Sequence, residues 1–310
     1  MSGPSPSAVL SLLRSQLLIH PKPSKSSFSS QTVIVTGGNT GLGREAAKQI
    51  VQLDAAKVII TSRNVAKGEA AREYIQQQTG RDIVEVWQLD LSSFESVRAF
   101  AKRAETLDRL DAATITTNVI STSMLANLLL PVMLRTSDAY PDLTPRMTFV
   151  GSGLHKFATL KARKAPGSVF DNLKELSADN SSDQDMRYND SKLLLQLYAS
   201  RLSTSIPTSS ATKRPKVCIN VVNPGYCISN LVSTQSIGQK VGERLLARST
   251  EEGGQALVDA VAAECVDGRH GAYVDDMQVK KPAHWIGTKE GQETKERVWQ
   301  ELNAILGVAQ

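Results

Sequence analysis

A glycine-rich turn between two apolar runs constrains the fold of this 310-residue chain more than any other feature. The turn spans residues 36–43 and contains four glycines. It follows the apolar run 33–35, opens a predicted helix over 42–53 and leads to a second apolar run at 58–60. This order of strand, turn, helix and strand is the context that a dinucleotide-binding fingerprint requires.

Strand-length apolar runs alternate with helix-like stretches along the rest of the chain. The expected strands are 32–36, 57–61, 83–89, 110–115, 147–150, 217–222 and 271–274. The expected helices are about 42–53, 65–78, 92–107, 118–135, 186–204 and 251–265. Ser92 is the expected N-cap of the third helix, with Glu95 completing a capping box. The alternation predicts an α/β fold with a doubly wound parallel sheet of about seven strands and helices on both faces.

The expected organisation is an N-terminal extension over residues 1–30 and one domain over residues 31–310. Two stretches interrupt the rhythm of strands and helices. Residues 156–184 form a lysine- and serine-rich connection, longer than an ordinary loop, that is functional or poorly ordered. Residues 231–249 are either a segment that closes over a substrate or a solvated loop.

The N-terminal leader has no acidic residue before Glu45, and it contains Arg14, Lys22, Lys25 and many serines. That composition is typical of a mitochondrial transit peptide. A short helix over residues 8–19 packed on the domain explains the same leucines. We therefore expect a cytoplasmic protein, with a mitochondrial location as the alternative.

Composition argues against several classes of partner. The net charge is +5, but no basic helix or aromatic-interleaved stripe is present, so nucleic acid is not an expected partner. No apolar run is expected to reach the roughly 20 residues that span a bilayer, so no integral membrane segment is predicted. The three cysteines, Cys218, Cys227 and Cys265, are odd in number and lack metal-ligand spacing. Neither a disulfide framework nor a metal site is expected, which fits a reducing compartment.

Tyr188 and Lys192 lie four residues apart in a predicted helix. Positions i and i+4 share a helix face, so the ammonium of Lys192 can lie near the phenol of Tyr188. A neighbouring cation favours the phenolate, and this brings proton exchange with a carbonyl or alcohol oxygen nearer to neutral pH. The alternative interpretation of the pair is a solvated helix face.

Three motifs occur in order: the glycine turn, the Tyr188/Lys192 pair, and the Asn-Pro-Gly sequence at 223–225. Together they make the chain resemble the short-chain dehydrogenase/reductase superfamily from about residue 32 to 275. Within it, the chain resembles fungal secondary-metabolite reductases and the retinol-dehydrogenase-like group. The resemblance implies a Rossmann fold, a small-molecule carbonyl or alcohol substrate, and, by analogy with relatives that pair through helices, a homo-oligomer.

The resemblance also implies roles for four catalytic residues. Ser152 would hydrogen-bond the substrate oxygen, and Tyr188 would donate or accept the proton. Lys192 would hold the nicotinamide ribose, and Asn118 matches the asparagine that fixes a proton-relay water. The alternative for Ser152 is a helix or turn cap, and for Asn118 it is a helix N-cap.

For the cofactor, the resemblance assigns each glycine of the turn a separate task. Gly37 permits the tight turn, Gly41 lets the backbone approach the pyrophosphate, and Gly43 allows the helix to pack closely on the strand. Leu42 would pack beneath them. Asp90 matches the family's adenine-binding aspartate, and a plain turn at the strand end is its alternative.

Charge favours NADP(H) over NAD(H). NAD-dependent enzymes typically carry an acid about 20 residues beyond the glycines, but here that place reads Thr-Ser-Arg at 61–63. Arg63 offers a planar donor group for a 2′-phosphate, and Arg44 adds a second cation; both arginines facing solvent is the alternative. The residues expected at the cofactor are Gly37, Gly41, Leu42, Gly43, Arg44, Ser62, Arg63, Asp90, Asn118, Tyr188, Lys192, Pro224, Gly225 and Ser229.

The chain departs from the family pattern after its fourth strand. Relatives carry an Asn-Asn-Ala-Gly sequence and roughly two dozen further residues before the active-site asparagine, whereas here residues 110–117 lead straight to Asn118. The coding region is mispredicted or spliced short, the chain is a degenerate copy, or the short loop is tolerated. We expect the fourth strand to lose its C-terminal end or the next helix to shift in register.

Two rival functions follow. A catalytically impaired protein that binds nucleotide without turnover would explain the missing segment. A methyltransferase with a related glycine turn would leave Tyr188 and Lys192 without a role.

Overall fold

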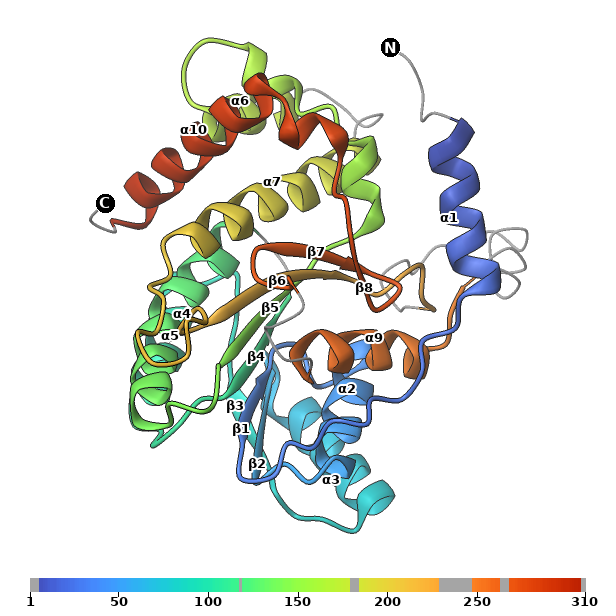
Figure 1. The fold of residues 1–310 in the computed structure, drawn as a ribbon, viewed down its shortest axis with the longest axis vertical. Helices are drawn as coiled ribbons and strands as arrows, with labels where there is room; N and C mark the ends of the chain where they lie inside the picture. Colours follow the sequence, from blue (N-terminus) through green and yellow to red (C-terminus); the bar gives the residue numbers. More distant parts are fainter. Residues whose placement is uncertain (1–5, 117–118, 179–183, 229–246, 263–267, 308–310) are drawn as a thin grey trace.

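In the computed structural model the described residues are 6–116, 119–178, 184–228, 247–262 and 268–307. Within these ranges eight strands form a single sheet in the order β3-β2-β1-β4-β5-β6-β7-β8 (Figure 1). The strands are β1 (Thr32–Val35), β2 (Lys57–Ser62), β3 (Val84–Gln88), β4 (Ala112–Ile115), β5 (Arg146–Val150), β6 (Cys218–Asn223), β7 (Ala272–Asp275) and β8 (Gln278–Lys280). All neighbouring strands run parallel except the final pair, β7 and β8.

The described helices connect and flank these strands. They are α1 (Pro6–Leu18), α2 (Gly41–Gln52), α3 (Val65–Thr79), α4 (Phe94–Ala104), α5 (Val119–Ala139), α6 (Val169–Ala178), α7 (Gln184–Thr204), α9 (Thr250–Ala262) and α10 (Lys289–Leu306). Three short 3-10 helices are η1 (Gly153–Phe157), η2 (Lys161–Lys164) and η4 (His284–Gly287).

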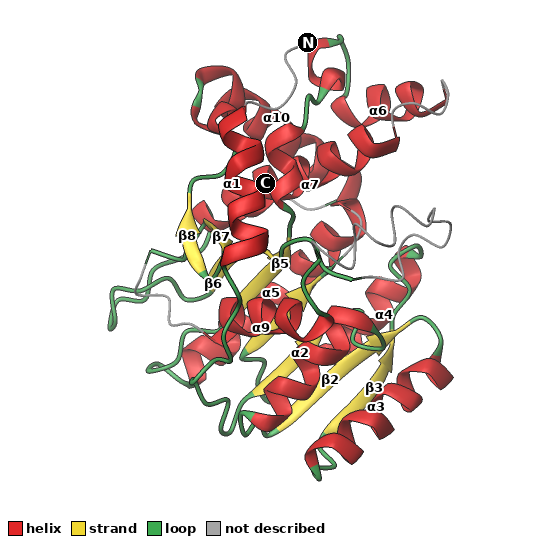
Figure 2. Ribbon diagram, turned by 90° about the vertical axis from the view of Figure 1, so that its right-hand side faces the viewer, coloured by secondary structure: helices red, strands yellow, loops and turns green. Residues whose placement is uncertain are grey.

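Helices cover both faces of the sheet (Figures 1 and 2). Helices α2, α3 and α9 cover one face, while α4, α5 and α7 cover the other, with α10 packed against α7. Successive side chains of a strand point to opposite faces. Val33 and Val35 therefore pack in the core beneath α2, α3 and α9, whereas Ile34 packs in the core beneath α4, α5 and α7. Strands that are buried on both faces form continuous apolar runs. The apolar runs in the sequence therefore predicted where these strands lie.

The predicted doubly wound parallel sheet is confirmed, with one strand more than expected. All seven predicted strands are present, and β8 adds a three-residue antiparallel edge. Several described helical elements were not predicted: η1, η2 and α6 lie in or next to the connection at 156–184, and η4 and α10 lie toward the C-terminus. The predicted N-cap of α4 is wrong by one position, because the Ser93 hydroxyl, not that of Ser92, accepts the hydrogen bond from the Ser96 amide.

The short connection between β4 and α5 leaves the fourth strand paired on both sides. Residues of β4 pair with β1 as far as Thr114 and with β5 as far as Ile115. Of the two expected consequences, loss of the C-terminal end of the strand does not occur in the described residues, and the shift of the next helix stays a prediction. The described part of α5 begins at Val119, so at most three residues separate strand from helix.

Two further findings qualify the sequence analysis. Cys218 is disulfide-bonded, a bond that the sequence did not predict, whereas Cys227 is free and buried. By length and composition alone, one helix in the described part of the chain, α5, could cross a membrane, although its sequence is not a continuous apolar run. In the most apolar window of α5, 61% is buried inside the protein, as in a core helix.

Candidate active site

Helix α7 brings Tyr188 and Lys192 to the carboxyl end of β5. The Lys192 ammonium donates a hydrogen bond to the Val150 carbonyl oxygen at 2.9 Å, and it lies 5.6 Å from the centroid of the Tyr188 ring. Burial lowers the pKa of Lys192 to about 8, because the charged form loses water. Tyr188 is exposed, with 46% of its surface accessible. A buried amine thus lies beside a solvent-accessible phenol.

Ser152 lies two residues beyond β5, in the turn that leads into η1. Its hydroxyl oxygen accepts a hydrogen bond from the Leu154 amide at 3.2 Å and so caps η1. Helix η1 packs against α7, which places Ser152 in the same region as the buried lysine. The hydroxyl therefore performs the capping that was its alternative interpretation, but its own proton finds no acceptor among the described residues.

His155 was not identified from the sequence, although it lies three residues after Ser152. Its Nδ1 lies 2.7 Å from the Ser152 carbonyl oxygen, and its Nε2 lies 3.1 Å from the Ala283 backbone nitrogen. Since the Ala283 amide can only donate, Nε2 accepts and Nδ1 carries the proton. Burial lowers the pKa of His155 to about 4. The neutral ring thus fastens the Ser152 backbone to the chain before η4.

The glycine turn has the shape that a bound pyrophosphate needs. Gly37 and Gly41 have positive φ values of 65° and 53°. A side chain on Gly43 would meet the Gly37 carbonyl oxygen at 2.5 Å, whereas one on Gly41 would enter open space. Thr40 at the start of α2 makes no side-chain cap hydrogen bond, and the first turn of α2 has no acidic residue. The first amides of this helix are thus suited to an anion.

Four threonines, to which the sequence assigned no role, support this turn. The Thr36 hydroxyl donates to the Thr114 carbonyl at 2.9 Å and accepts from the Thr116 amide at 2.9 Å. The Gly37 amide donates to the Thr61 hydroxyl at 3.2 Å. These bonds join β1, β2 and β4 where the turn begins.

The residues predicted to lie beside the adenosine differ in their burial and in the groups that they contact. Arg63 is exposed, and its charge contributes to the environment of Asp90. Hydrogen bonds from the Ser92 hydroxyl and amide hold the pKa of Asp90 below its ordinary value. Arg44 stacks over Tyr74 at 4.1 Å. The buried Ser62 hydroxyl donates a hydrogen bond to the Asn64 carbonyl oxygen. Its proton is therefore already used in a bond within the turn that follows β2.

The segment after β6 contains the predicted Pro224 and Gly225. Gly225 has a φ of 87°, and its amide donates to the Asn223 side chain at 3.2 Å. The Pro224 carbonyl accepts from Arg248 at 3.2 Å. Leu42, predicted to pack beneath the turn, packs against the core cluster that covers the α2 face of the sheet. Asn118 and Ser229 lie outside the described residues.

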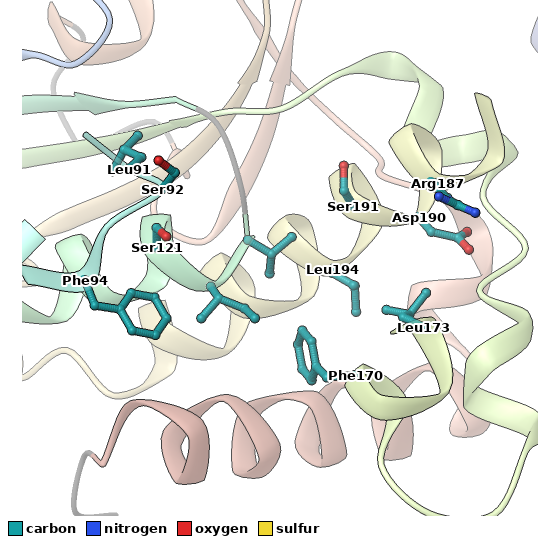
Figure 3. A pocket seen from close by; sticks show the side chains of 12 residues that line it. Leu91, Ser92, Phe94, Ser121, Phe170, Leu173, Arg187, Asp190, Ser191 and Leu194 are labelled. Atoms are coloured by element: carbon teal, nitrogen blue, oxygen red, sulfur yellow. The ribbon is translucent and has the colours of Figure 1, made fainter. Parts of the chain in front are cut away.

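A cavity of about 470 Å³ lies next to this region, between α5, α6 and α7 (Figure 3). Its walls are mainly apolar, and Figure 3 shows Phe170 and Leu173 of α6 turned toward Leu194 of α7. Ser191 lies three residues after Tyr188, on the same side of α7, and Leu194 lies further round the helix. Among the described residues no group of histidine, cysteine, aspartate or glutamate side chains could hold a metal ion.

Comparisons with known proteins show which proteins this chain is similar to. A family model described as short chain dehydrogenase matches residues 31–128. A short chain dehydrogenase/reductase of Cryptosporiopsis sp. is 35% identical over 89% of this chain and 90% of its own. A short-chain dehydrogenase of Penicillium roqueforti is 32% identical over 96% of this chain and 83% of its own.

Solved structures share the fold at lower sequence identity. A short chain dehydrogenase from Shigella flexneri has a TM-score of 0.57 at 18% identity, covering 86% of this chain and 98% of that one. A short chain dehydrogenase from Escherichia coli CFT073, complexed with NADPH, has a TM-score of 0.57 at 17% identity, covering 83% of this chain and all of that one.

Proposed function

Since this chain belongs to the short-chain dehydrogenase family, we propose that it is an NADP(H)-dependent oxidoreductase acting on a carbonyl or secondary alcohol. The observation that carries the proposal is the position of Lys192, which lies beside the Tyr188 ring and is bonded to the end of β5. The open amino end of α2 supports it, because residues at that turn fit a dinucleotide pyrophosphate.

Three residues of this chain have separate roles around the reacting oxygen: Tyr188, Ser152 and Lys192. NADP(H), when bound, supplies or accepts the hydride at its nicotinamide ring. Tyr188, exposed at the surface of α7, donates the proton to a carbonyl oxygen in reduction and removes it from an alcohol in oxidation. Ser152 orients that oxygen through its hydroxyl proton, and the charge of Lys192 favours the phenolate.

Arg63 and Arg44 support a preference for NADP(H). Arg63 is exposed beyond β2, and no carboxylate occupies residues 61–63. The planar guanidinium of an arginine can bind a phosphate through two charge-assisted hydrogen bonds, whereas a ribose hydroxyl carries no charge and cannot accept such a pair. Arg44 would contribute from the first turn of α2 while it stacks on Tyr74. With NADPH, reduction is the proposed direction in the cell.

We propose a lipophilic substrate and a role in secondary metabolism. The resemblance to fungal secondary-metabolite reductases supports this proposal. The apolar cavity beside α7 also suits a lipophilic molecule, because ligand pockets of this size are mainly apolar.

The test uses purified protein, NADPH and a panel of ketones and aldehydes. Oxidation of NADPH is followed by its absorbance, and Tyr188→Phe is expected to abolish it. Tyr140→Phe is the matched control, because Tyr140 is also about half exposed but lies beyond α5. Equal rates for wild type and Tyr188→Phe would refute the assigned acid.

A second candidate is nucleotide binding without turnover. The observation that favours it is the short link from β4 to α5, where relatives carry a longer segment. Calorimetry separates the two candidates. Binding of NADPH with no oxidation across the whole panel supports the second, and oxidation of any substrate rejects it.

A further inference from the structure

Two polar side chains of helix α1 are buried against the rest of the protein. Ser15 and Gln16 are buried, whereas Leu10 and Leu18 are 68% and 72% exposed. Surface helices usually dock through an apolar stripe. At Ser15 and Gln16, however, α1 contacts the protein through polar side chains, whose hydrogen bonds help to determine where the helix lies.

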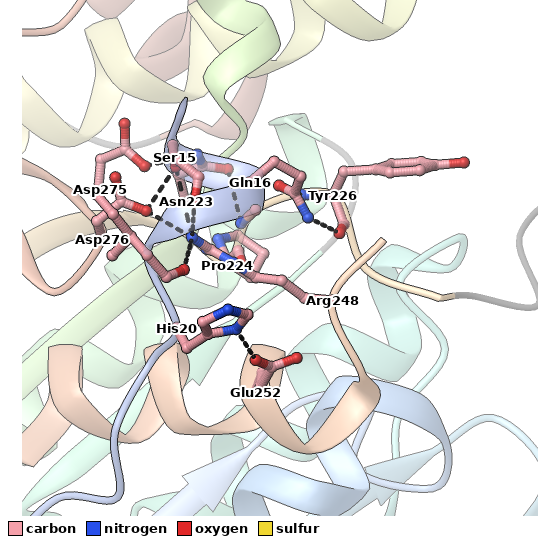
Figure 4. Close-up of polar contacts among 12 residues, drawn as sticks. Ser15, Gln16, His20, Asn223, Pro224, Tyr226, Arg248, Glu252, Asp275 and Asp276 are labelled. Atoms are coloured by element: carbon pink, nitrogen blue, oxygen red, sulfur yellow. Dashed lines mark hydrogen bonds and ion pairs between the residues drawn. The ribbon is translucent and has the colours of Figure 1, made fainter. Parts of the chain in front are cut away.

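Gln16 binds the backbone of the segment that follows β6. Its amide nitrogen donates to the Tyr226 carbonyl oxygen at 2.6 Å, and its amide oxygen accepts from the Tyr226 amide at 3.0 Å. One side chain therefore satisfies both backbone groups of one residue, as a neighbouring strand would. Figure 4 shows this pair beside the segment of residues 224–226.

Arg248 connects the same segment to α1 from the other side (Figure 4). Its side chain is 1% exposed and donates to the Pro224 carbonyl at 3.2 Å, the Ser15 carbonyl at 3.0 Å and the Ile19 carbonyl at 2.9 Å. It also forms an ion pair of 2.7 Å with Asp276, which accepts from the Ser15 hydroxyl at 2.6 Å. A buried arginine with four acceptors holds three parts of the chain in one arrangement.

The arginine also fills the space that a side chain at residue 225 would need. A Cβ on Gly225 would lie 2.5 Å from a guanidinium nitrogen of Arg248. The positive φ of Gly225, 87°, disfavours any other residue there for a second reason. The backbone of residues 224–226 is thus held by Gln16 and Arg248 together.

We propose that α1 and Arg248 position residues 224–226 for the nicotinamide end of the cofactor, with Gln16 and Arg248 as positioning residues. The inference rests on the proposed function and on the expectation from the sequence that Pro224 and Gly225 contact the cofactor. Holding these residues in place before binding reduces the ordering cost of the complex. The N-terminal extension is thereby part of the cofactor site.

The experiment compares wild type with Gln16→Ala and a matched control, Gln292→Ala. Gln292 also donates its amide to a backbone carbonyl, that of Ile286 at 2.6 Å, but it lies in α10. Hydrogen exchange of the amides at residues 225–228 and the Kd for NADPH are measured for each protein. We expect Gln16→Ala to exchange faster there and to bind NADPH about tenfold more weakly, and Gln292→Ala to match wild type in both.

Each other outcome has a definite meaning. Unchanged exchange in Gln16→Ala overturns the coupling between α1 and the segment. Faster exchange with an unchanged Kd, in a protein whose wild type binds NADPH, overturns the role in cofactor binding alone. If wild type binds no dinucleotide, the proposed function fails and this inference fails with it.

Discussion

The side-chain nitrogen of Lys192 lies 2.9 Å from the carbonyl oxygen of Val150, a residue 42 positions earlier in the chain. This bond fastens α7 to the end of β5, where Ser152 follows. It also buries the amine, and burial lowers the pKa of Lys192 to about 8. Lys192 therefore gains or loses its charge as the pH passes through about 8.

The first prediction concerns the pH dependence of kcat/KM, which reports groups of the free enzyme. Carbonyl reduction is expected to decline above pH 8, because Lys192 loses the charge that favours the phenolate of Tyr188. Lys192→Arg keeps a charge at every accessible pH, so its residual rate should show no inflection near pH 8. The same inflection in both proteins would assign it to another group.

The second prediction concerns acid stability and His155. The folded pKa, about 4, lies below the ordinary value of 6.5, so the unfolded chain binds the proton more readily. The stabilising contribution of the neutral ring is present above pH 6.5 and is lost as pH falls toward 4. Between pH 7 and 5 this single group should cost about 2 kcal/mol of unfolding free energy.

Urea denaturation at the two pH values tests this prediction. His155→Gln removes the titrating ring, so its loss of stability between pH 7 and 5 should be about 2 kcal/mol smaller than that of wild type. Equal losses in the two proteins would mean that His155 is not kept neutral by burial.

The sheet was predictable because its strands are buried on both faces. Runs such as Val58, Ile59 and Ile60 have no polar interruption, and only a central parallel strand explains them at that length. Helix α10 escaped prediction because it is mainly polar, with Val298 and Leu302 as its fully buried apolar side chains. Strand β8 has only three residues, none of them buried, so no apolar run marks it.

The candidate site was predictable only where a local motif exists. Gly43 and the Tyr188/Lys192 pair act through spacings of a few residues, which a sequence displays. His155 bonds to Ala283, 128 positions away, and Arg248 bonds to Ser15, 233 positions away. Such contacts depend on how α1 and the C-terminal segment fold back across the sheet, and no local pattern encodes them.

The third prediction concerns close packing at the glycine turn. An alanine Cβ at residue 43 would lie 2.5 Å from the Gly37 carbonyl oxygen, so backbone must move. Gly43→Ala should lose about 1–3 kcal/mol of unfolding free energy and should bind NADPH more weakly, because the turn shifts. Gly287→Ala is the control, since a side chain there meets nothing within 4 Å. Thermal unfolding and calorimetry of both variants measure these effects, and unchanged binding by Gly43→Ala would separate the turn from the cofactor.

The fourth prediction concerns the choice between NADPH and NADH. Arg63 is exposed just beyond β2, and its charge reaches Asp90 across the predicted adenosine site. Arg63→Glu would place a carboxylate where the 2′-phosphate is expected, so KM for NADPH should rise about tenfold or more while KM for NADH changes little. Lys289→Glu makes the same charge change at a 92% exposed lysine of α10 and should alter neither KM. A parallel rise for both cofactors in Arg63→Glu would show that this arginine does not read the phosphate.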